Sequence, residues 1–260
     1  MKYIFRNVFS RPGLLVLVFL LLSAGLPAGL FAAEWRVVPI RLDFSQKVKS
    51  GVVAVHNTGD EALHVSVTAK TWRQDEAGQD QYSDAPELIF FPKSITIKPR
   101  SERVVRVGIK APAIKQEKAY RLFITEEKAP AKNSSQVAVA LRFGIPVFAK
   151  PLEEQIAGDI ADVQVADGTL AFSIRNRGNA HFRTTRIEVI GKDASGQAVF
   201  TEELKGWYLL AGADRPYRAP IPQDRLSSLA TIDIQIATDR MELFKSLAFD
   251  GTAQVPPQVE

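Results

Sequence analysis

Residues 136–148 read QVAVALRFGIPVF and carry the clearest structural pattern in the chain. With a period of two, the large apolar side chains fall on one face, namely Val137, Val139, Leu141, Phe143, Ile145 and Val147. The opposite face is mostly small. This alternation predicts a β-strand over Val137–Phe148. At roughly 3.3 Å per residue, its apolar face would run for about 40 Å.

Gly144 and Pro146 favour a place for this strand at the edge of a sheet. Proline has no N–H for a central strand to donate, so it is found at edges and bulges. A long apolar edge promotes aggregation, and a chain that keeps one is expected to add it to a partner's sheet. The alternative is a central strand whose inward side chains fill a sandwich core. Periodicity alone leaves both interpretations open.

Most of the chain after residue 33 shows the same strand-like pattern. Short alternating or apolar runs are separated by turn dipeptides about ten residues apart, which is typical of sandwiches and barrels. Trp35–Phe44 is the first predicted strand, with Pro39 at an edge or a bulge. Gly51–His56 and Leu63–Trp72 flank Asn57-Thr58-Gly59-Asp60, and this arrangement predicts a β-hairpin.

The remaining predicted strands are short, and residues 75–84 are interpreted as a polar loop. In the first half the strands are Leu88–Phe91, Ser94–Ile97, Val104–Ile109 and Tyr120–Thr125. In the second half they are Leu170–Arg175, Thr185–Gly191, Val199–Leu204, Trp207–Leu210, Ile232–Ala237 and Leu243–Phe249. The boundary between the halves is expected at Pro151–Asp159. We therefore expect an all-β chain of two seven-strand, immunoglobulin-like sandwiches.

Residues 1–33 have the order of a cleavable secretory signal. Three basic residues precede the apolar run Leu14–Leu22, and helix-breaking residues follow before Ala32 and Ala33. Cleavage after one of these alanines would release the chain into the periplasm, leaving no other contact with a membrane. The alternative is an uncleaved anchor, because Gly13–Ala33 is about 20 residues long and could just span a bilayer.

The charge of the chain says little about partners once this leader is removed. The full chain has 33 Lys+Arg and 29 Asp+Glu, and loss of three basic leader residues leaves 30 against 29. Residues 33–151 carry 19 basic and 13 acidic groups, whereas residues 152–260 carry 11 and 16. This asymmetry favours two domains with different roles. No concentrated basic surface is evident, so nucleic acid is not an expected partner.

The residue types present do not predict catalysis. The chain has no cysteine, which excludes thiol nucleophiles and thiolate metal sites and leaves each domain dependent on its apolar core. His56 and His64 flank the predicted hairpin and could approach each other, but two imidazoles make an incomplete metal site. Acidic doublets such as Glu126-Glu127 point to opposite faces of a strand and form no acid–base pair. We expect no enzyme, no metal and no cofactor.

Several segments together resemble PapD-like pilus-assembly chaperones. They are PIRLDF (39–44), VVAVHNTGDEALHVSV (52–67), the Phe91–Val107 region, YRLFITE (120–126) and RFGIPVF (142–148) with Lys150-Pro151. RNRGNAHF (175–182) and GWYLLAGADRPY (206–217) are similar to the second domain of the divergent archaic branch. The resemblance covers residues 35–250. It implies two tandem immunoglobulin-like β-sandwich domains set at an angle, at 34–151 and 152–253, between the signal at 1–33 and a disordered tail at 254–260.

The resemblance also implies a function. Chaperones of this family bind and stabilise pilin subunits by donor-strand complementation, without ATP, and deliver them to an outer-membrane usher. The last strand of the first domain temporarily completes the subunit's unfinished sandwich. By motif position, the subunit-binding residues here are Val137, Val139, Leu141, Phe143 and Ile145. An open edge of this kind also allows a self-capping homodimer of the free chaperone.

Members of this family anchor the subunit's C-terminal carboxylate with an arginine on the first strand and a lysine on the last. The matching arginine here is Arg41, but Pro146 occupies the position of the lysine. Proline carries no charge, so another cation is expected to take its place. Arg142, on the same strand face as Pro146, and Arg106 are the candidates, because a guanidinium binds a carboxylate in a fork.

The family further shares a charge cluster between the two domains. By motif position, the cluster here would contain Glu126, Lys150 and Asp239. Lysine stands where arginine is usual, so the bidentate geometry is lost. The main alternative to a chaperone is an exported β-sandwich component of a surface fibre or an envelope scaffold.

Overall fold

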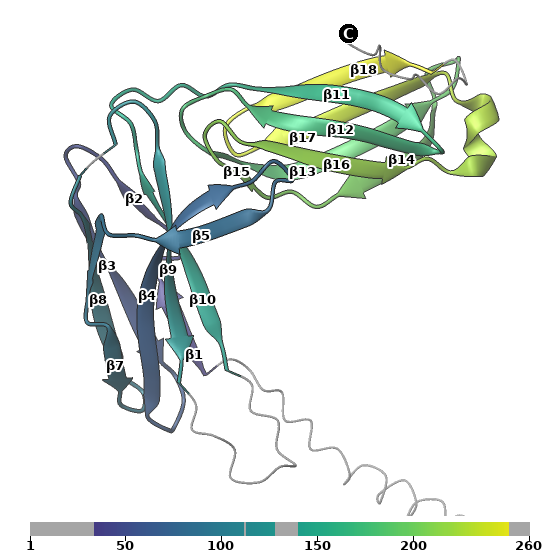
Figure 1. The fold of residues 1–260 in the computed structure, drawn as a ribbon. Coiled ribbons are helices and arrows are strands. Elements are labelled where there is room, and N and C mark those ends of the chain that lie inside the picture. The colour runs from purple at the N-terminus through teal and green to yellow at the C-terminus, as the bar shows by residue number, and fades with distance from the viewer. Residues whose placement is uncertain (1–33, 112, 128–139, 250–260) are drawn as a thin grey trace, which may run out of the picture. The chain divides into compact units, whose positions relative to one another are not determined.

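The computed structural model describes residues 34–111, 113–127 and 140–249. These residues form strands almost throughout, joined by loops and by a short 3-10 helix at Gln223–Ser228 (Figure 1). No helix in these ranges is long and apolar enough to cross a membrane. The all-β prediction is confirmed.

The strands up to residue 149 form one β-sandwich of two sheets. In the first sheet the order is β1 (Trp35–Val38), β3 (Ser50–Asn57), β8 (Glu102–Ile109) and β6 (Leu88–Phe91). In the second it is β2 (Leu42–Phe44), β10 (Arg142–Ala149), β9 (Lys118–Glu126), β4 (Leu63–Gln74) and β5 (Asp80–Asp84), and β7 (Ser94–Ile97) also pairs with β4. Alternate residues of both sheets point inward and form one apolar core.

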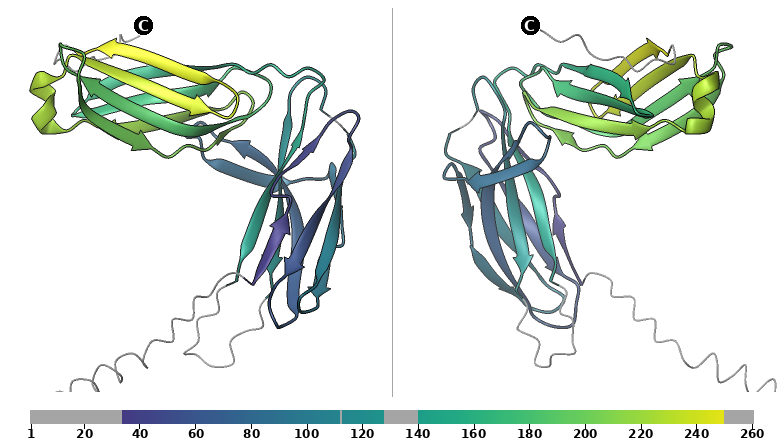
Figure 2. Two further views of the ribbon diagram at one scale, coloured as in Figure 1. Left: turned by 180° about the vertical axis from the view of Figure 1, so that it is seen from behind. Right: turned by 45° about the vertical axis from the view of Figure 1, so that its right-hand side comes forward.

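The strands after residue 157 form a second sandwich with its own core. One sheet has the order β11 (Gly158–Ala166), β12 (Thr169–Asn176) and β16 (Asp214–Pro220). The other has the order β14 (Ala198–Leu204), β13 (Phe182–Lys192), β17 (Thr231–Thr238) and β18 (Glu242–Ala248), with β15 (Tyr208–Leu209) also paired to β13. The colours separate the strands of the two sandwiches in both turned views (Figure 2).

Two predictions about the first sandwich are wrong in detail. Trp35–Phe44 is not one strand, because β1 pairs with β3 in one sheet and β2 pairs with β10 in the other. The chain crosses between the sheets at the segment that contains Pro39. Both β1 and β2 lie at the edges of their sheets, where a proline is tolerated. The segment between β3 and β4 likewise joins two different sheets and is not a hairpin turn.

Three strands were not predicted: β5 and β16 are mostly polar, and a β-bulge between Ala161 and Gln164 interrupts the alternation of β11. β5 lies in the segment interpreted as a loop, and β11 and β16 lie between predicted strands. All three occupy sheet edges among the described strands. β5 and β16 show little apolar periodicity because most of their side chains are exposed or half-buried.

Asn57 and Asn176 occupy equivalent turns in the two sandwiches. Each closes a strand, and each side-chain oxygen accepts a bond from the backbone N–H two residues later, at Gly59 and Gly178. The amide nitrogen of Asn57 donates to the carbonyls of Glu61, Ile97 and Lys98, and that of Asn176 to those of Ala180 and Leu209. Both asparagines are almost fully buried. The Asn-x-Gly turn is therefore a structural feature common to both halves.

Candidate functional site

Strand β10 has a sheet edge without a neighbouring strand over most of its length. It pairs with β9 along its whole length, from Arg142 opposite Thr125 to Ala149 opposite Lys118. On its other side β2 covers only residues 147–149. Among the described strands, these are its only neighbours. Residues 142–146 therefore form an open edge. This is the segment in which Gly144 and Pro146 favoured an edge position.

The backbone groups that face this edge follow from the register. The N–H of Glu126 donates to the carbonyl of Leu141 at 2.9 Å. In an antiparallel pair the bonding direction alternates, so odd-numbered residues of β10 bond to β9 and even-numbered residues face away. The bond from the Lys150 N–H to the Phe44 carbonyl, 2.9 Å, agrees with this. The N–H that Pro146 lacks would thus have faced the open edge, and its absence costs no bond to β9.

The predicted subunit-binding row is only partly available at this edge. Val137 and Val139 lie outside the described residues. Leu141 and Phe143 are half-buried at the border of the first core, where the Phe143 ring meets the Trp35 ring edge-on with centroids 4.5 Å apart. Ile145 is only 2% exposed and fills the chain's own core. Of the described members, Leu141 and Phe143 are therefore the two that a partner could reach without a rearrangement.

The three arginines proposed to hold a carboxylate lie in different places. Arg41 precedes β2, and its Nε and Nη2 donate to the carboxylate of Asp43 at 2.8 and 2.7 Å. Burial alone would lower the pKa of Arg41, but the hydrogen bond and charge of Asp43 outweigh it and raise the pKa above its usual value. Arg142 lies with its guanidinium carbon 3.7 Å from the centroid of the Phe123 ring. Arg106 is exposed on β8, in the other sheet, so it does not lie beside Pro146.

Arg121, which the sequence analysis did not select, lies directly opposite Pro146 on β9. Its side chain is 7% exposed, and its guanidinium carbon lies 3.8 Å from the centroid of the Trp72 ring. Its Nη1 donates to the carbonyl of Gly144 at 3.0 Å. Among the described residues its Nε has no hydrogen-bond partner. A single arginine within the apolar run YRLFIT is the only local signal for this residue, and it does not reveal the contacts with Gly144 and Trp72.

Next to Arg121, an aromatic cluster contains side chains of both sandwiches, which belong to one compact unit, Trp35–Glu260. Trp72, Phe148 and Leu210 are buried together, and Tyr208 packs against them. The centroids of the Trp72 and Tyr208 rings lie 5.4 Å apart. The guanidinium of Arg41 lies 5.2 Å from the Phe148 ring. Both Arg41 and Arg121 thus lie against this cluster.

The predicted charge cluster does not form as expected. Lys150 pairs with Glu154 at 3.0 Å, and Arg240 pairs with the same carboxylate. Asp239 accepts a bond from the backbone N–H of Arg183 at 2.7 Å. Glu126 lies opposite Leu141, roughly 30 Å from Lys150 along β10 at about 3.4 Å per residue. Lys150 is therefore part of an ion cluster, but its partner is Glu154.

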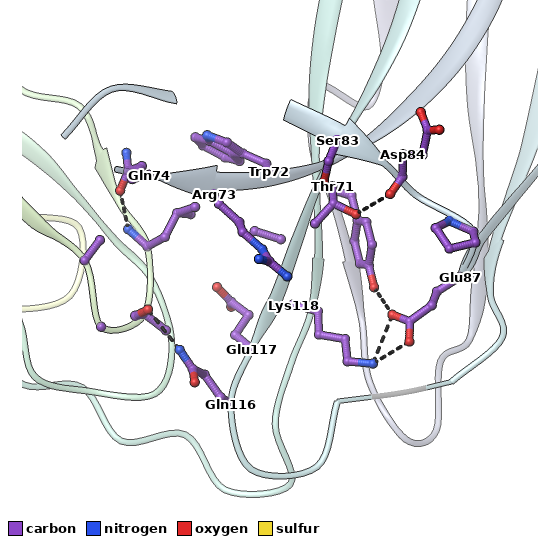
Figure 3. A pocket seen from close by; sticks show the side chains of 17 residues that line it. Thr71, Trp72, Arg73, Gln74, Ser83, Asp84, Glu87, Gln116, Glu117 and Lys118 are labelled. Atoms are coloured by element: carbon purple, nitrogen blue, oxygen red, sulfur yellow. Dashed lines mark hydrogen bonds and ion pairs between the residues drawn. The ribbon is translucent and has the colours of Figure 1, made fainter. Parts of the chain in front are cut away.

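A pocket of about 750 Å³ is lined by β4, β5, β9 and the segment Leu210–Ala213 (Figure 3). Lys118 and Glu87 pair with each other, whereas Asp84 and Glu117 pair with Lys70 and His181 outside the lining. Lys118 donates to both oxygens of Glu87, at 2.9 and 3.0 Å, and Tyr120 donates to the same carboxylate at 2.6 Å. These bonds from Lys118 and Tyr120 lower the pKa of Glu87, and burial followed by the bond to Glu87 raises the pKa of Tyr120. The pocket therefore offers few free charges to a ligand.

The histidines do not assemble a metal site in the described part of the chain. Within it, no group of three or more His, Cys, Asp or Glu side chains could hold a metal ion. His56 lies 2.9 Å from Glu102, whereas His64 lies 2.9 Å from the Thr96 hydroxyl on the other sheet. The approach of these two histidines was predicted from a hairpin, and the chain has no hairpin at that position.

Residues 36–154 match the family model described as "Pili and flagellar-assembly chaperone, PapD N-terminal domain". The first sandwich is a PapD N-terminal domain. The match covers the open edge of β10, Arg41 and Arg121. PapD-like proteins are chaperones and not enzymes, so the expectation that the chain is no enzyme is confirmed. No curated protein matches the sequence.

Solved structures share the PapD-like fold over both sandwiches. A chain of the CsuC–CsuE chaperone–tip adhesion subunit pre-assembly complex, from archaic chaperone-usher Csu pili of Acinetobacter baumannii, has a TM-score of 0.58 at 20% identity, over 81% of this chain and 98% of that one. The YadV chaperone has 0.54 at 11% identity, over 83% and 99%. A chain of the Salmonella enterica SafA pilin–SafB chaperone complex has 0.51 at 10% identity, over 82% and 96%. This likeness confirms the predicted two-sandwich fold.

Proposed function

We propose that this chain is a periplasmic chaperone that binds pilin subunits through the edge of β10 and delivers them to an outer-membrane usher. The observation that carries the proposal is the open edge over residues 142–146, at the end of a PapD N-terminal domain. Two of the similar structures are complexes of a chaperone, one with a tip adhesion subunit and one with a pilin, which supports the proposal.

The proposed mechanism is the addition of β10 to an unfinished sheet of the subunit. Backbone N–H and C=O groups on the open edge supply hydrogen bonds, and side chains at alternate positions cover the subunit's core. Leu141 and Phe143 are half-buried and lie at the border of the chaperone's own core, so a partner core can extend it. Val137 and Val139 would continue the same row. No cofactor or ATP is required, because the energy comes from strand pairing and apolar burial.

We further propose that Arg41 contributes to holding the subunit's C-terminal carboxylate, with Arg142 nearer the start of the strand. Arg41 already binds a carboxylate in the two-bond geometry that such an anchor needs, with Asp43 as the acceptor. Arg106 does not fit this role, because it lies on the other sheet of the sandwich.

Strand addition can be tested by co-expression with the pilin subunit encoded beside the chaperone's gene. The wild-type chain is expected to yield a soluble one-to-one complex. The double variant Leu141→Asp plus Phe143→Asp should lose it, because two carboxylates would be buried against the subunit's core. Phe244→Asp is the matched control, since Phe244 is 63% exposed in the second sandwich. A folded double variant that still yields the complex would refute strand donation through this row.

The location and the usher step need separate measurements. The mature protein should occur in the periplasmic fraction with its N-terminus after Ala32 or Ala33, as read by intact mass. The chaperone–subunit complex, and not the free subunit, should bind the purified usher.

Recovery of the chain as a stoichiometric part of purified surface fibres would instead support the structural-component alternative. Sedimentation of the free protein reports whether two copies cap each other's β10 edge.

A further inference from the structure

The open edge of β10 is blocked at a defined position. The carbonyl of Gly144 faces away from β9, as the register requires, yet it already accepts a hydrogen bond from Nη1 of Arg121 at 3.0 Å. A partner strand would normally donate to this carbonyl. Two residues further on, Pro146 has no N–H to offer a partner, and from Val147 onward β2 occupies the edge. Among residues 142–149, the N–H and C=O of Arg142 and the N–H of Gly144 are therefore the backbone groups that remain available to pair with a partner strand.

The position of Arg121 over the strand is determined by its neighbours. Gly144 has no side chain, and a Cβ there would lie 3.1 Å from the Phe123 ring and 4.0 Å from Cδ of Arg121. The absence of a side chain at Gly144 thus makes room for the Phe123 ring, whereas Arg121 lies at an ordinary contact distance across β10. On its other side the guanidinium lies against the Trp72 ring at 3.8 Å. Stacking and a charge-assisted hydrogen bond hold Arg121 over the Gly144 carbonyl.

We propose that Arg121 and Pro146 form a register stop, which ends the pairing of a subunit's strand at Gly144. This inference rests on the proposed function, since it concerns how the bound strand is aligned. A slip of the partner along β10 by two residues toward Phe148 would require displacement of Arg121 and would leave a partner carbonyl without a donor at Pro146. An unpaired backbone group of this kind is costly when buried, so the stop selects one register.

Hydrogen exchange with mass-spectrometric detection tests the stop in the complex with the subunit encoded beside the chaperone's gene. In the wild-type complex the amides of Arg142 and Gly144 should exchange at least about tenfold more slowly than in the free chain. The amides of residues 147–149 should be unchanged, because β2 already pairs with them.

Two variants separate the contributions of the two residues. Pro146→Ala adds an amide at the edge, but it should stay unprotected in the complex while Arg121 remains. Combining it with Arg121→Met, which keeps the packing on Trp72 and removes the donors, should let pairing extend and protect the new amide by about tenfold. Arg106→Met is the matched control from the other sheet and should leave the protection pattern unchanged.

The outcomes distinguish the two proposals. If a stable complex forms and the new amide is protected in Pro146→Ala alone, or unprotected in the folded double variant, the register stop is wrong and strand donation stands. If the wild-type chain forms no complex with the subunit, strand donation itself is refuted and the stop with it. Circular dichroism and thermal unfolding of each free variant establish that it is folded.

Discussion

The ring of Phe148 lies flat on the imidazole of His181, with centroids 3.6 Å apart and planes 12° apart. Phe148 belongs to β10 of the first sandwich, and His181 precedes β13 of the second. Nδ1 of His181 lies 2.8 and 2.9 Å from the two carboxylate oxygens of Glu117, and both side chains are 2% exposed. The strand with the open edge therefore ends in a buried contact that includes both sandwiches.

Removing the Phe148 ring should destabilise the whole chain. Phe148 is fully buried, so Phe148→Ala leaves a cavity and is expected to cost about 3–5 kcal/mol in the free energy of unfolding. Phe244→Ala, at a ring that is 63% exposed, should change it by less than about 0.5 kcal/mol. Denaturant unfolding followed by circular dichroism gives both values. Similar losses in the two variants would contradict the role assigned to this contact.

The ion cluster around Glu154 should make stability depend on pH. The bond from Arg240, and then that from Lys150, outweigh partial burial and hold the pKa of Glu154 below its usual value. A carboxyl whose pKa is lower in the folded chain stabilises it above the unfolded pKa of about 4.3, and this contribution disappears as pH falls through the folded value.

Glu154→Gln should therefore lower the free energy of unfolding by about 0.5–1 kcal/mol at pH 7, the upper range for partly exposed ion pairs. The loss relative to the wild type should shrink as the pH is lowered below 4. Unfolding curves at a series of pH values measure it. A difference that is constant with pH would show that the carboxylate charge is not the cause.

The two buried asparagines should have similar effects on stability. Asn57→Ala and Asn176→Ala each leave buried carbonyls and a turn N–H without their partner, so each is expected to cost about 2–3 kcal/mol. Asn57→Asp should be nearly as harmful, because the carboxylate can accept from Gly59 but cannot donate to the Ile97 carbonyl. Thermal unfolding of the variants is the measurement. If both alanine variants have the melting temperature of the wild type, the hydrogen bonds of these turns do not stabilise the chain.

Gly178 is expected to tolerate no side chain. A Cβ there would lie 2.1 Å from the backbone carbonyl oxygen of Gln155, which cannot move away as a side chain could. Gly178→Ala should therefore destabilise the chain by about 1–3 kcal/mol or more. Gly108→Ala is the comparison, since its Cβ would meet the Lys49 carbonyl at an ordinary 3.4 Å. Equal melting temperatures of the two variants would argue against close packing at Gly178.

Sequence periodicity predicted the strands that bury one face, because a half-buried strand needs alternating apolar side chains. The edge strands β5 and β16 were missed because their residues are mostly polar, and β11 was missed because a bulge shifts the alternation between Ile160 and Val165. The edge at β10 was predictable from Pro146, whose missing N–H is a local property. Arg121 was not, because its importance depends on its being opposite Pro146 and beneath Trp72, and both relationships come from the pairing of strands far apart in the chain.

The pairing of β2 with β10 delays completion of the first sandwich until late in the chain. Leu42 lies opposite Val147, so the sheet that contains both cannot close before more than a hundred further residues are available. Contacts between such distant segments form slowly, because a long loop must be closed before they stabilise the fold. A chain that emerges with its N-terminus first therefore cannot complete this sheet until residues 142–149 have emerged, although every strand of the other sheet is present by Ile109. The last strand to arrive is the one with the open edge, so the first sandwich and its binding edge are completed together.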